Sequence, residues 1–206
     1  MKTLDEIRRE IPGFAYSDYL RHLSAAEKAG SNGRPLRVAL LRSYTVEPIE
    51  PILKVHLLLE GFAPSIWIGG YNQYRQEILD ADSPLYEMRP DVVLIMIRLE
   101  EIMPDFVDAY PSVPRADWED RVAVKVQELG DLIERVERGF SAQVLVQNMA
   151  LPDGGYFGIN DIQKTDGQTY LIHRFNQSLA AEVSPRRGVF LWDFERLVSS
   201  IGFDNL

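Results

Sequence analysis

The sequence predicts an α/β protein in which a parallel sheet lies between two layers of helices. Short apolar runs rich in Val, Ile and Leu, with little polar alternation, are typical of strands buried on both faces. These runs alternate along the chain with longer segments whose apolar residues recur every three to four positions, which indicates amphipathic helices. Alternating strands and helices form βαβ units. We therefore expect a three-layer α/β/α sandwich with a parallel sheet of about five strands.

Five short segments are the candidate strands. They are the stretches 37–42, 65–69, 91–97, 143–147 and 188–192. The helices of this part of the chain are expected at 47–60, 117–138, 168–182 and 194–201. The first has Pro48 and Pro51 near its first turn, where proline is tolerated, and stops at Gly61. In the second, apolar residues from Trp118 to Val136 recur at helical spacing, so one face of this helix is expected in the core.

The N-terminal segment differs from the rest of the chain. Residues 1–30 are expected to form one or two helices, interrupted where Ile11, Pro12 and Gly13 break the helical pattern. Residues 31–35 form a loop, after which strands and helices alternate. We therefore divide the chain into an N-terminal helical extension, 1–35, and an α/β domain, 36–206.

The composition of the 206-residue chain narrows the functional classes. A net charge of −9 disfavours binding to nucleic acid and to anionic lipid, because both need a positive face. Without cysteine, the chain has no disulfide, thiol nucleophile or cysteine-based zinc site. The longest apolar run, 92–97, is far shorter than the roughly 20 residues of a membrane span. No signal-peptide pattern opens the chain, so we expect a cytoplasmic protein without a nucleic-acid or membrane partner.

Candidate site residues follow the predicted strands, because ligands of open α/β sheets bind beyond the carboxyl ends of the strands. Two of these residues are candidates for catalysis, namely Ser43 after the first strand and Asp193 after the fifth. The candidates for substrate binding are Thr45, Gly69, Gly70, Asn72, Arg98 and Asn148.

Ser43 is the candidate nucleophile. Between a strand end and a helix start, its hydroxyl can point into the crevice beside backbone amides that stabilise an oxyanion. Alternatively, Ser43 or Thr45 caps the helix that follows. A nucleophile also needs a base, and the three histidines, His22, His56 and His173, all fall within predicted helices.

The residues after the second and third strands are candidates either for ligand binding or for a structural role. Gly69 and Gly70 let the backbone approach a ligand closely, and the helix N-terminus behind them favours anionic or carbonyl groups. The alternative is a plain turn in which Asn72 caps the helix. Arg98 either holds a carboxylate or phosphate or forms a structural ion pair with Asp193 or a nearby glutamate. No Walker A motif, Rossmann glycine pattern or metal-ligand spacing occurs, so we expect neither a nucleotide cofactor nor a metal.

Four sequence blocks resemble the N-terminal domain of FkbH-like proteins. They are VALLRSYTVEPIEP at 38–51, YNQYRQEILD at 71–80, QNMALP at 147–152 and LWDFERL at 191–197. The resemblance covers about residue 36 to the end of the chain. It implies a domain similar to SGNH hydrolases, with a flavodoxin-like fold, that is followed in the family by a domain of the haloacid-dehalogenase (HAD) superfamily. It also implies polyketide-type biosynthesis, in which such proteins load a glyceryl unit from a phosphorylated glycerate onto an acyl carrier protein.

The chain departs from SGNH hydrolases at the residues that carry their catalysis. Those enzymes place the serine in a Gly-Asp-Ser block, of which RSY at 42–44 keeps the serine alone. Gly69 or Gly70 can match their backbone glycine, but 98–101 lacks the asparagine of their third block. Their last block is Asp-x-x-His, and no histidine follows His173. We expect the architecture to persist without the usual triad.

Two functions follow from this resemblance. The first is a non-catalytic or degenerate domain that assists acyl or glyceryl loading, with an acyl carrier protein or a C-terminal HAD-type domain as partner and a small acyl or glyceryl group as substrate. The alternative is a serine-dependent esterase or acyltransferase with Ser43 as nucleophile and Asp193, through water, or a residue beyond Leu206 as base. The enzyme requires an exposed Ser43 about 2.6–3.2 Å from a base, whereas the binding domain requires an open crevice or a basic patch.

The acidic charge of the chain constrains the docking of a carrier protein. Acyl carrier proteins are themselves acidic, so docking needs a local basic patch. The candidates are Arg34, Arg37, Arg186 and Arg187. Because no HAD-type domain is found before Leu206, we expect the chain to be a fragment of a longer protein or a stand-alone relative.

Overall fold

The computed structural model of the protein describes residues 3–108, 110, 114–152 and 154–202, and these residues contain a five-stranded sheet. The strand order is β2-β1-β3-β4-β5, and every pairing is parallel. The strands are β1 Arg34–Arg42, β2 Phe62–Ile68, β3 Val92–Met96, β4 Gln143–Gln147 and β5 Val189–Trp192. The prediction of an α/β fold with about five parallel strands is confirmed.

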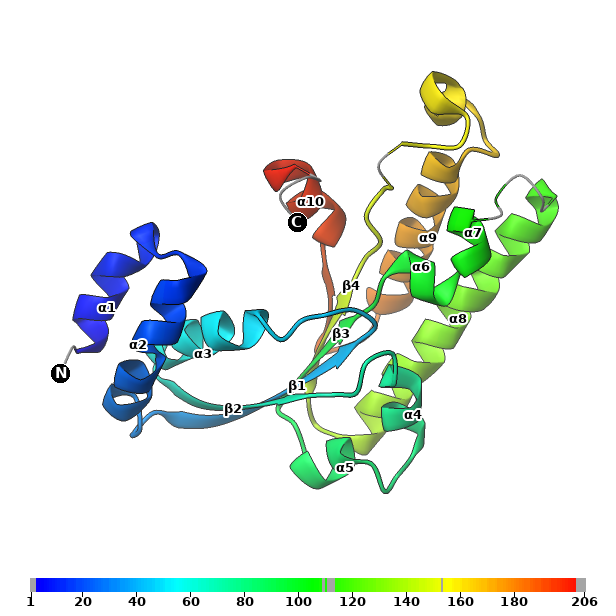
Figure 1. Cartoon of the computed structure of the whole chain (residues 1–206). Helices are drawn as coiled ribbons and strands as arrows, with labels where there is room; N and C mark the ends of the chain where they lie inside the picture. The colour runs from blue at the N-terminus through cyan, green and yellow to red at the C-terminus, as the bar shows by residue number, and fades with distance from the viewer. Residues whose placement is uncertain (1–2, 109, 111–113, 153, 203–206) are drawn as a thin grey trace.

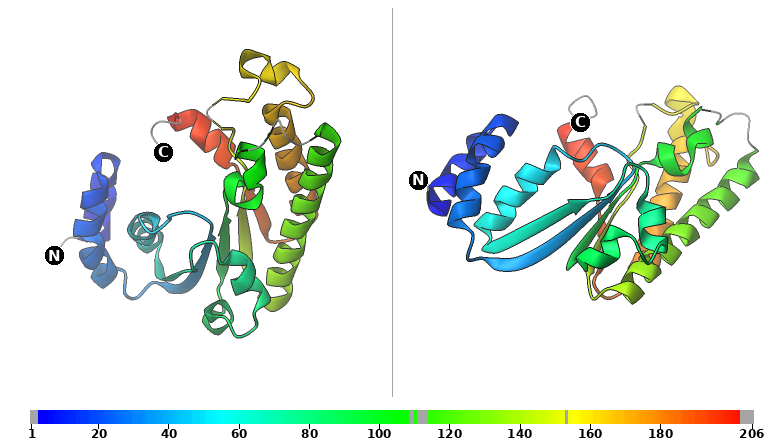
Figure 2. Two further views of the ribbon diagram at one scale, coloured as in Figure 1. Left: turned by 45° about the vertical axis from the view of Figure 1, so that its right-hand side comes forward. Right: turned by 60° about the horizontal axis from the view of Figure 1, so that its bottom comes forward.

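Helices cover both faces of the sheet (Figure 1, Figure 2). One face carries α3, Ile49–Leu59. The opposite face carries α4 Tyr74–Leu79, α5 Pro84–Met88, α8 Arg115–Gly139 and α9 Gln168–Val183. The carboxyl edge of the sheet carries α6 Leu99–Ile102, α7 Pro104–Asp108, the 3₁₀ helix η3 Gly158–Gln163 and α10 Phe194–Ile201 (Figure 1).

Alternate residues of β1 pack against the two helical layers. Ala39 and Leu41 belong to the core on the side of α8 and α9, whereas Val38 and Leu40 belong to the core on the side of α3. All four side chains are buried. Because both faces of the strand are covered, it has no solvent-facing side on which polar residues would alternate. This burial explains the continuous apolar run in the sequence.

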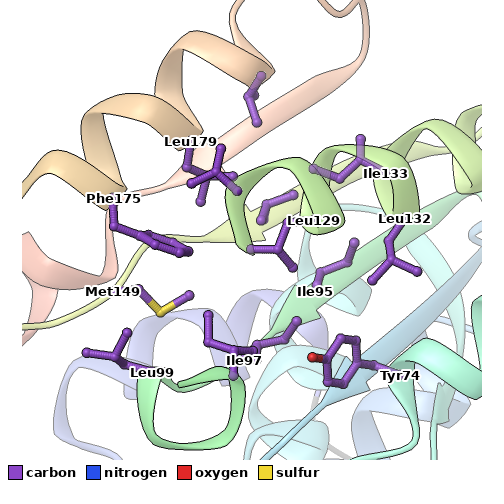
Figure 3. Close-up of a cluster of buried hydrophobic side chains, with 14 of the residues drawn as sticks. Tyr74, Ile95, Ile97, Leu99, Leu129, Leu132, Ile133, Met149, Phe175 and Leu179 are labelled. Atoms are coloured by element: carbon purple, nitrogen blue, oxygen red, sulfur yellow. The ribbon is translucent and has the colours of Figure 1, made fainter. Parts of the chain in front are cut away.

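The larger core lies between the sheet and the pair α8 and α9. Figure 3 shows Ile95 of β3 and Ile133 of α8 near Phe175 and Leu179 of α9. The apolar residues that recur at helical spacing in the predicted helix 117–138 are all buried, so the prediction of an amphipathic helix is confirmed. They are Trp118, Val122, Val126, Leu129, Ile133 and Val136.

The N-terminal helices α1, Leu4–Glu10, and α2, Tyr16–Ala29, pack against α3. A 3₁₀ turn, η1, at Ile11–Gly13 separates them, as its proline and glycine predict. Ile7 and Ala26 of these helices belong to one buried cluster with Val55 of α3. The division of the chain at residue 35 stays a prediction, and β1 begins close to it.

Both β1 and β2 begin earlier than predicted, and Gly33 is the physical reason. A Cβ atom at Gly33 would lie 2.6 Å from the carbonyl carbon of Phe62. Glycine is therefore the residue that lets the backbone before β1 approach the start of β2 this closely. Pairing therefore starts with Arg34 opposite Phe62 and continues to Leu40 opposite Ile68.

Candidate functional site

The carboxyl ends of β1 and β3 form the point at which the chain switches faces of the sheet. These strands are neighbours, yet β1 leads to α3 on one face and β3 leads, through α6 and α7, to α8 on the other. Ligands of open α/β sheets bind in the crevice at such a point. Ser43 and Arg98 lie directly beyond these two strands, so the fold brings them together.

Ser43 joins the two strand ends through its backbone and its hydroxyl group. Its N–H donates to the Met96 carbonyl oxygen at 3.0 Å, and its Oγ accepts from the Arg98 N–H at 2.9 Å. The residue is 0% exposed. The candidate nucleophile is thus enclosed and hydrogen-bonded to the backbone, and its catalytic role stays a prediction.

Helix capping, the alternative role for Ser43 and Thr45, is wrong. Helix α3 begins at Ile49 after an N-cap at Pro48, and no side-chain hydrogen bond caps it. The φ of Pro48, −64°, already suits the first turn of a helix. Thr45 is exposed in the loop before the helix.

The three histidines lie in helices, as predicted. His22 belongs to α2 and His56 to α3. His173 belongs to α9, and its Nε2 lies 3.1 Å from Glu195 Oε1. Among the described residues, no histidine is hydrogen-bonded to Ser43.

A tyrosine and a glutamine bridge the same strand ends. The Tyr44 hydroxyl donates to Gln147 Oε1 at 2.6 Å, and Gln147 Nε2 donates to the Ile97 carbonyl oxygen at 3.4 Å. Burial raises the pKa of Tyr44 to about 12, although the nearby Arg98 charge opposes the rise. The phenol therefore stays neutral at ordinary pH and keeps donating its hydrogen bond.

The Arg98 guanidinium lies over the Tyr44 ring, with 4.9 Å between its Cζ and the ring centroid. The structural ion pair considered for Arg98 is wrong for the part of the chain that the structure describes, where no carboxylate pairs with this side chain. Asp193, the partner considered, is hydrogen-bonded elsewhere. Because Arg98 is exposed, its guanidinium is available to an anionic ligand.

Arg42, which is not among the site residues predicted from the sequence, holds together the loops after β1 and β2. Its Nε donates to the Gly69 carbonyl oxygen at 3.0 Å, and its guanidinium pairs with Glu47 at 2.8 Å. The Asn72 N–H donates to the Arg42 carbonyl oxygen at 3.1 Å, while the Asn72 side chain donates to Glu101 Oε2 at 3.0 Å. A charged residue at the end of an apolar strand was the sequence signal for this role.

The capping role considered for Asn72 is wrong, because α4 begins at Tyr74 with Gln73 as its N-cap. Asn72 instead has a left-handed φ of 53°, which asparagine tolerates. A Cβ atom on Gly70 would lie 2.3 Å from Gln73 Oε1, so the glutamine side chain occupies the space over this glycine. Ligand contact at Gly69 and Gly70 stays a prediction, and at Gly70 it requires Gln73 to move.

Asn148 and Asp193 fasten α10 to the end of β4. Asn148 Nδ2 donates to Asp193 Oδ1 at 3.0 Å, and Asn148 Oδ1 accepts from the Glu195 N–H at 2.9 Å. Asp193 Oδ1 also accepts from the Arg196 N–H at 3.1 Å, so Asp193 is the N-cap of α10. The carboxylate considered as a base thus has a structural task, and its catalytic role stays a prediction.

A cavity of about 280 Å³ lies beyond the ends of β3 and β4. Its polar lining residues are Arg98, Glu100, Gln147 and Gln168, and the rest of its lining is apolar. Three of the apolar lining residues, Ile97, Leu99 and Met149, lie together at one end of the large core (Figure 3). Of the site residues predicted from the sequence, Arg98 lines this cavity.

The loop between β4 and α9 fixes the cavity wall at Gln168. Asp161 is 3% exposed and accepts from the Thr169 N–H at 2.9 Å and from the Gln168 N–H at 3.3 Å. Burial acts to raise the pKa of Asp161, but these hydrogen bonds lower it overall. The Gln168 side chain donates to the Phe106 carbonyl oxygen at 2.8 Å and accepts from the Tyr156 N–H at 2.7 Å. This wall was not predictable from the sequence, since its members come from separate segments.

Metal sites and membrane spans are both missing from the described residues. There, no group of three or more His, Asp or Glu side chains is placed to hold a metal ion. Within the same ranges, no helix is long and apolar enough to cross a membrane. The expected absence of a metal, a cofactor and a membrane partner stays a prediction.

The fold and the cavity define an α/β domain with a small-molecule-sized site at the carboxyl edge of a parallel sheet. The family described as FkbH, N-terminal domain, matches residues 52–206. The chain belongs to this family, so the resemblance is confirmed. Three of the four sequence blocks lie within the matched residues, whereas the block at 38–51 precedes them.

A solved structure shares this fold at low sequence identity. It is the N-terminal part of the protein BF1531 from Bacteroides fragilis, containing a phosphatase domain and complexed with Mg. The similarity covers 93% of this chain with a TM-score of 0.76 and 17% identity, so it concerns the fold alone. This chain spans about half, 48%, of the length of that chain. No curated protein matches the sequence.

Proposed function

We propose that this domain binds a partner during acyl or glyceryl loading onto an acyl carrier protein and has no serine catalysis of its own. Membership of the FkbH N-terminal domain family supports a place in such a pathway. The observation that carries the proposal is the buried Ser43 hydroxyl, which accepts a hydrogen bond from the Arg98 amide. A serine nucleophile needs a base that accepts its proton, and a backbone N–H is a donor.

The carrier docks, in this proposal, at the carboxyl edge of the sheet. The cavity lies at this edge, and Arg98 supplies an exposed cation to its lining. The exposed Glu100 lies in the same lining, so contact with an acidic carrier protein is favoured by the Arg98 side chain and not by a net positive charge of the cavity. The small acyl or glyceryl group is then held beside β3 and β4.

The basic residues considered from the sequence lie at the opposite, amino edge of the sheet. Arg34 and Arg37 belong to the start of β1, and Arg186 and Arg187 precede β5. Arg37 pairs with Asp91 at 2.9 Å, and Arg186 is bonded to two glutamates. Arg37 and Arg186 therefore attract a partner less, because their charges are already paired, whereas Arg34 and Arg187 are exposed cations at this edge.

A C-terminal HAD-type domain is the second partner that we propose. The family is described as an N-terminal domain, and the Bacteroides fragilis structure contains a phosphatase domain. Such a domain would pass its acyl or glyceryl group to the carrier held here. The competing function is an esterase or acyltransferase that uses Ser43. It requires the Ser43 hydroxyl to attack an acyl group, and this hydroxyl is buried in the structure.

Titration with an acyl carrier protein, followed by amide NMR shifts of this domain, tests the proposal. We expect the signals of Arg98 and Met149 to shift, while those of Arg34 and Arg187 at the amino edge stay in place. An absence of shifts, or shifts confined to the amino edge, would contradict the proposal.

A further inference from the structure

The cavity beside Arg98 has a charged mouth and an apolar interior. Arg98 and Glu100 are exposed, whereas Ile97, Leu99 and Met149 behind them are buried. A fully polar metabolite would leave hydroxyl groups against these apolar walls without hydrogen-bond partners. The cavity therefore favours a ligand with a charged end and a partly apolar body.

Two buried glutamines add a limited amount of hydrogen-bonding capacity to the interior. Gln147 accepts from the Tyr44 hydroxyl and donates to a carbonyl oxygen, and Gln168 accepts from a backbone N–H and donates to another carbonyl oxygen. A carboxamide has two N–H groups, and within the described ranges each glutamine donates one of them to a carbonyl oxygen, so the second can serve a ligand. These remaining donors suit the carbonyl oxygens of amide or thioester groups.

The mouth of the cavity carries one cation and one carboxylate. Arg98 is held over the Tyr44 ring and has no carboxylate partner within the described ranges. A guanidinium in this setting binds phosphate oxygens through paired N–H groups. Glu100 accepts hydrogen bonds, so it suits a hydroxyl or amide N–H close to that phosphate.

We infer that the cavity takes the 4′-phosphopantetheine arm of a carrier protein. The phosphate of this arm matches Arg98, its hydroxyl and first amide N–H match Glu100, and its amide carbonyls match Gln147 and Gln168. Its dimethyl group and the acyl group on its thioester match the apolar walls. This inference rests on the proposed function, and it names the part of the carrier that the site recognises.

Free 4′-phosphopantetheine, titrated into the isotope-labelled protein, tests this inference without a carrier protein. Shifts are expected in the amide signals of Arg98, Met149 and Ala150 and in the side-chain amide signals of Gln147 and Gln168. Pantetheine without its phosphate should bind roughly tenfold more weakly, because it lacks the charge-assisted contact. Equal binding of the two compounds would overturn the assignment of Arg98 to the phosphate, and an absence of binding by both would overturn the inference.

Two variants locate the binding site. Arg98→Ala should weaken 4′-phosphopantetheine binding roughly tenfold, and Ala150→Phe should abolish it by filling the cavity. Arg187→Ala and Ala181→Phe are the matched controls, because both residues are exposed and lie outside the cavity lining. Circular dichroism establishes that each variant is folded, and Arg98→Lys should recover part of the affinity. Unchanged binding by both cavity variants would overturn the inference.

The same carrier protein in its apo and holo forms separates this inference from the proposed function. We expect the holo form, which carries the arm, to bind at least tenfold more tightly than the apo form. Equal binding of the two forms would leave the proposed function standing and overturn recognition of the arm. Binding of neither form, together with binding of the free arm, would overturn the proposed function while supporting an arm-binding cavity.

Discussion

Ser43 and Arg98 lie 55 positions apart in the sequence, yet the Arg98 N–H donates a 2.9 Å hydrogen bond to the Ser43 hydroxyl. The bond links the carboxyl ends of β1 and β3, which is where ligands of open α/β sheets bind. The guanidinium of the same arginine lies over Tyr44 and lines the cavity. One residue therefore encloses the serine with its backbone and presents a cation to the cavity with its side chain.

Replacement of the enclosed serine should destabilise the fold. Ser43→Ala leaves the part-buried Arg98 amide without its acceptor, so the free energy of unfolding should fall by about 1–3 kcal/mol. Urea unfolding measures this difference. Thr45→Ala is the control, since this hydroxyl is exposed in the same loop and its removal should change stability by less than about 0.5 kcal/mol. Equal stability of Ser43→Ala and wild type would show that the hydroxyl does not hold the ends of β1 and β3 together.

The hydroxyl of Tyr44 should stabilise the protein in a pH-dependent way. Its folded pKa of about 12 exceeds the usual tyrosine value, so the folded state favours the neutral phenol. This contribution is complete below about pH 10 and is lost as the pH rises towards about 12. Tyr44→Phe should therefore lower the free energy of unfolding at neutral pH by about 1–2 kcal/mol, and the deficit should shrink above about pH 10.

Denaturant unfolding over this pH range measures the effect of Tyr44. Tyr16→Phe serves as the control, because Tyr16 is 46% exposed and its variant should follow the wild type throughout. A deficit that stays constant from neutral to alkaline pH would contradict the burial of the Tyr44 phenol.

Loss of the Asn148 amide should free α10 without unfolding the sheet. Asn148→Ala removes one hydrogen-bond donor from the Asp193 carboxylate and the side-chain acceptor of the Glu195 N–H. Hydrogen exchange of the α10 amides should become roughly tenfold faster, while exchange in β1 and β3 changes little. Gln177→Ala, an exposed change on α9, should leave α10 as in the wild type. Equal exchange rates of the α10 amides in Asn148→Ala and in the wild type would disprove the role of Asn148 in holding α10 to the end of β4.

Asp161 should make the cavity wall sensitive to acid. Its pKa is lowered in the folded protein, so its stabilising contribution is present above the usual carboxyl range and is lost as the pH falls through the lowered pKa. Asp161→Ala should lower the free energy of unfolding at neutral pH by about 1–3 kcal/mol and should flatten the acid dependence. Urea unfolding at neutral and acidic pH measures both effects, with the exposed substitution Asp82→Asn as control. An unchanged acid slope in Asp161→Ala would rule out this contribution.

The sheet and its main helices were predictable because burial on two faces leaves a direct trace in the sequence. Ala39 and Leu41 face one layer and Val38 and Leu40 the other, which requires an unbroken apolar run. The strand starts were less predictable. The early pairing of β1 with β2 depends on a close approach at Gly33, and a glycine before a strand is equally compatible with an ordinary turn.

The candidate site was predictable only in part. The rule that ligands bind beyond strand ends selected Ser43, Arg98, Asn148 and Asp193 as separate residues. The structure joins Ser43 to Arg98 and Asn148 to Asp193 by hydrogen bonds. The same rule could not distinguish a reactive serine hydroxyl from a buried hydrogen-bond acceptor. The difference depends on whether a base or a backbone N–H from a distant part of the chain lies next to the hydroxyl, and here it is the Arg98 N–H. The cavity was missed, since its walls combine α6, α7, the segment after β4 and the start of α9.

The most direct test of the central claim is the intact mass of the folded protein after exposure to a fluorophosphonate probe. The wild type should gain no adduct, because the Ser43 hydroxyl is buried and has a backbone N–H instead of a base as its described partner. A single adduct on the wild type that is absent from Ser43→Ala would contradict this account and establish an activated serine.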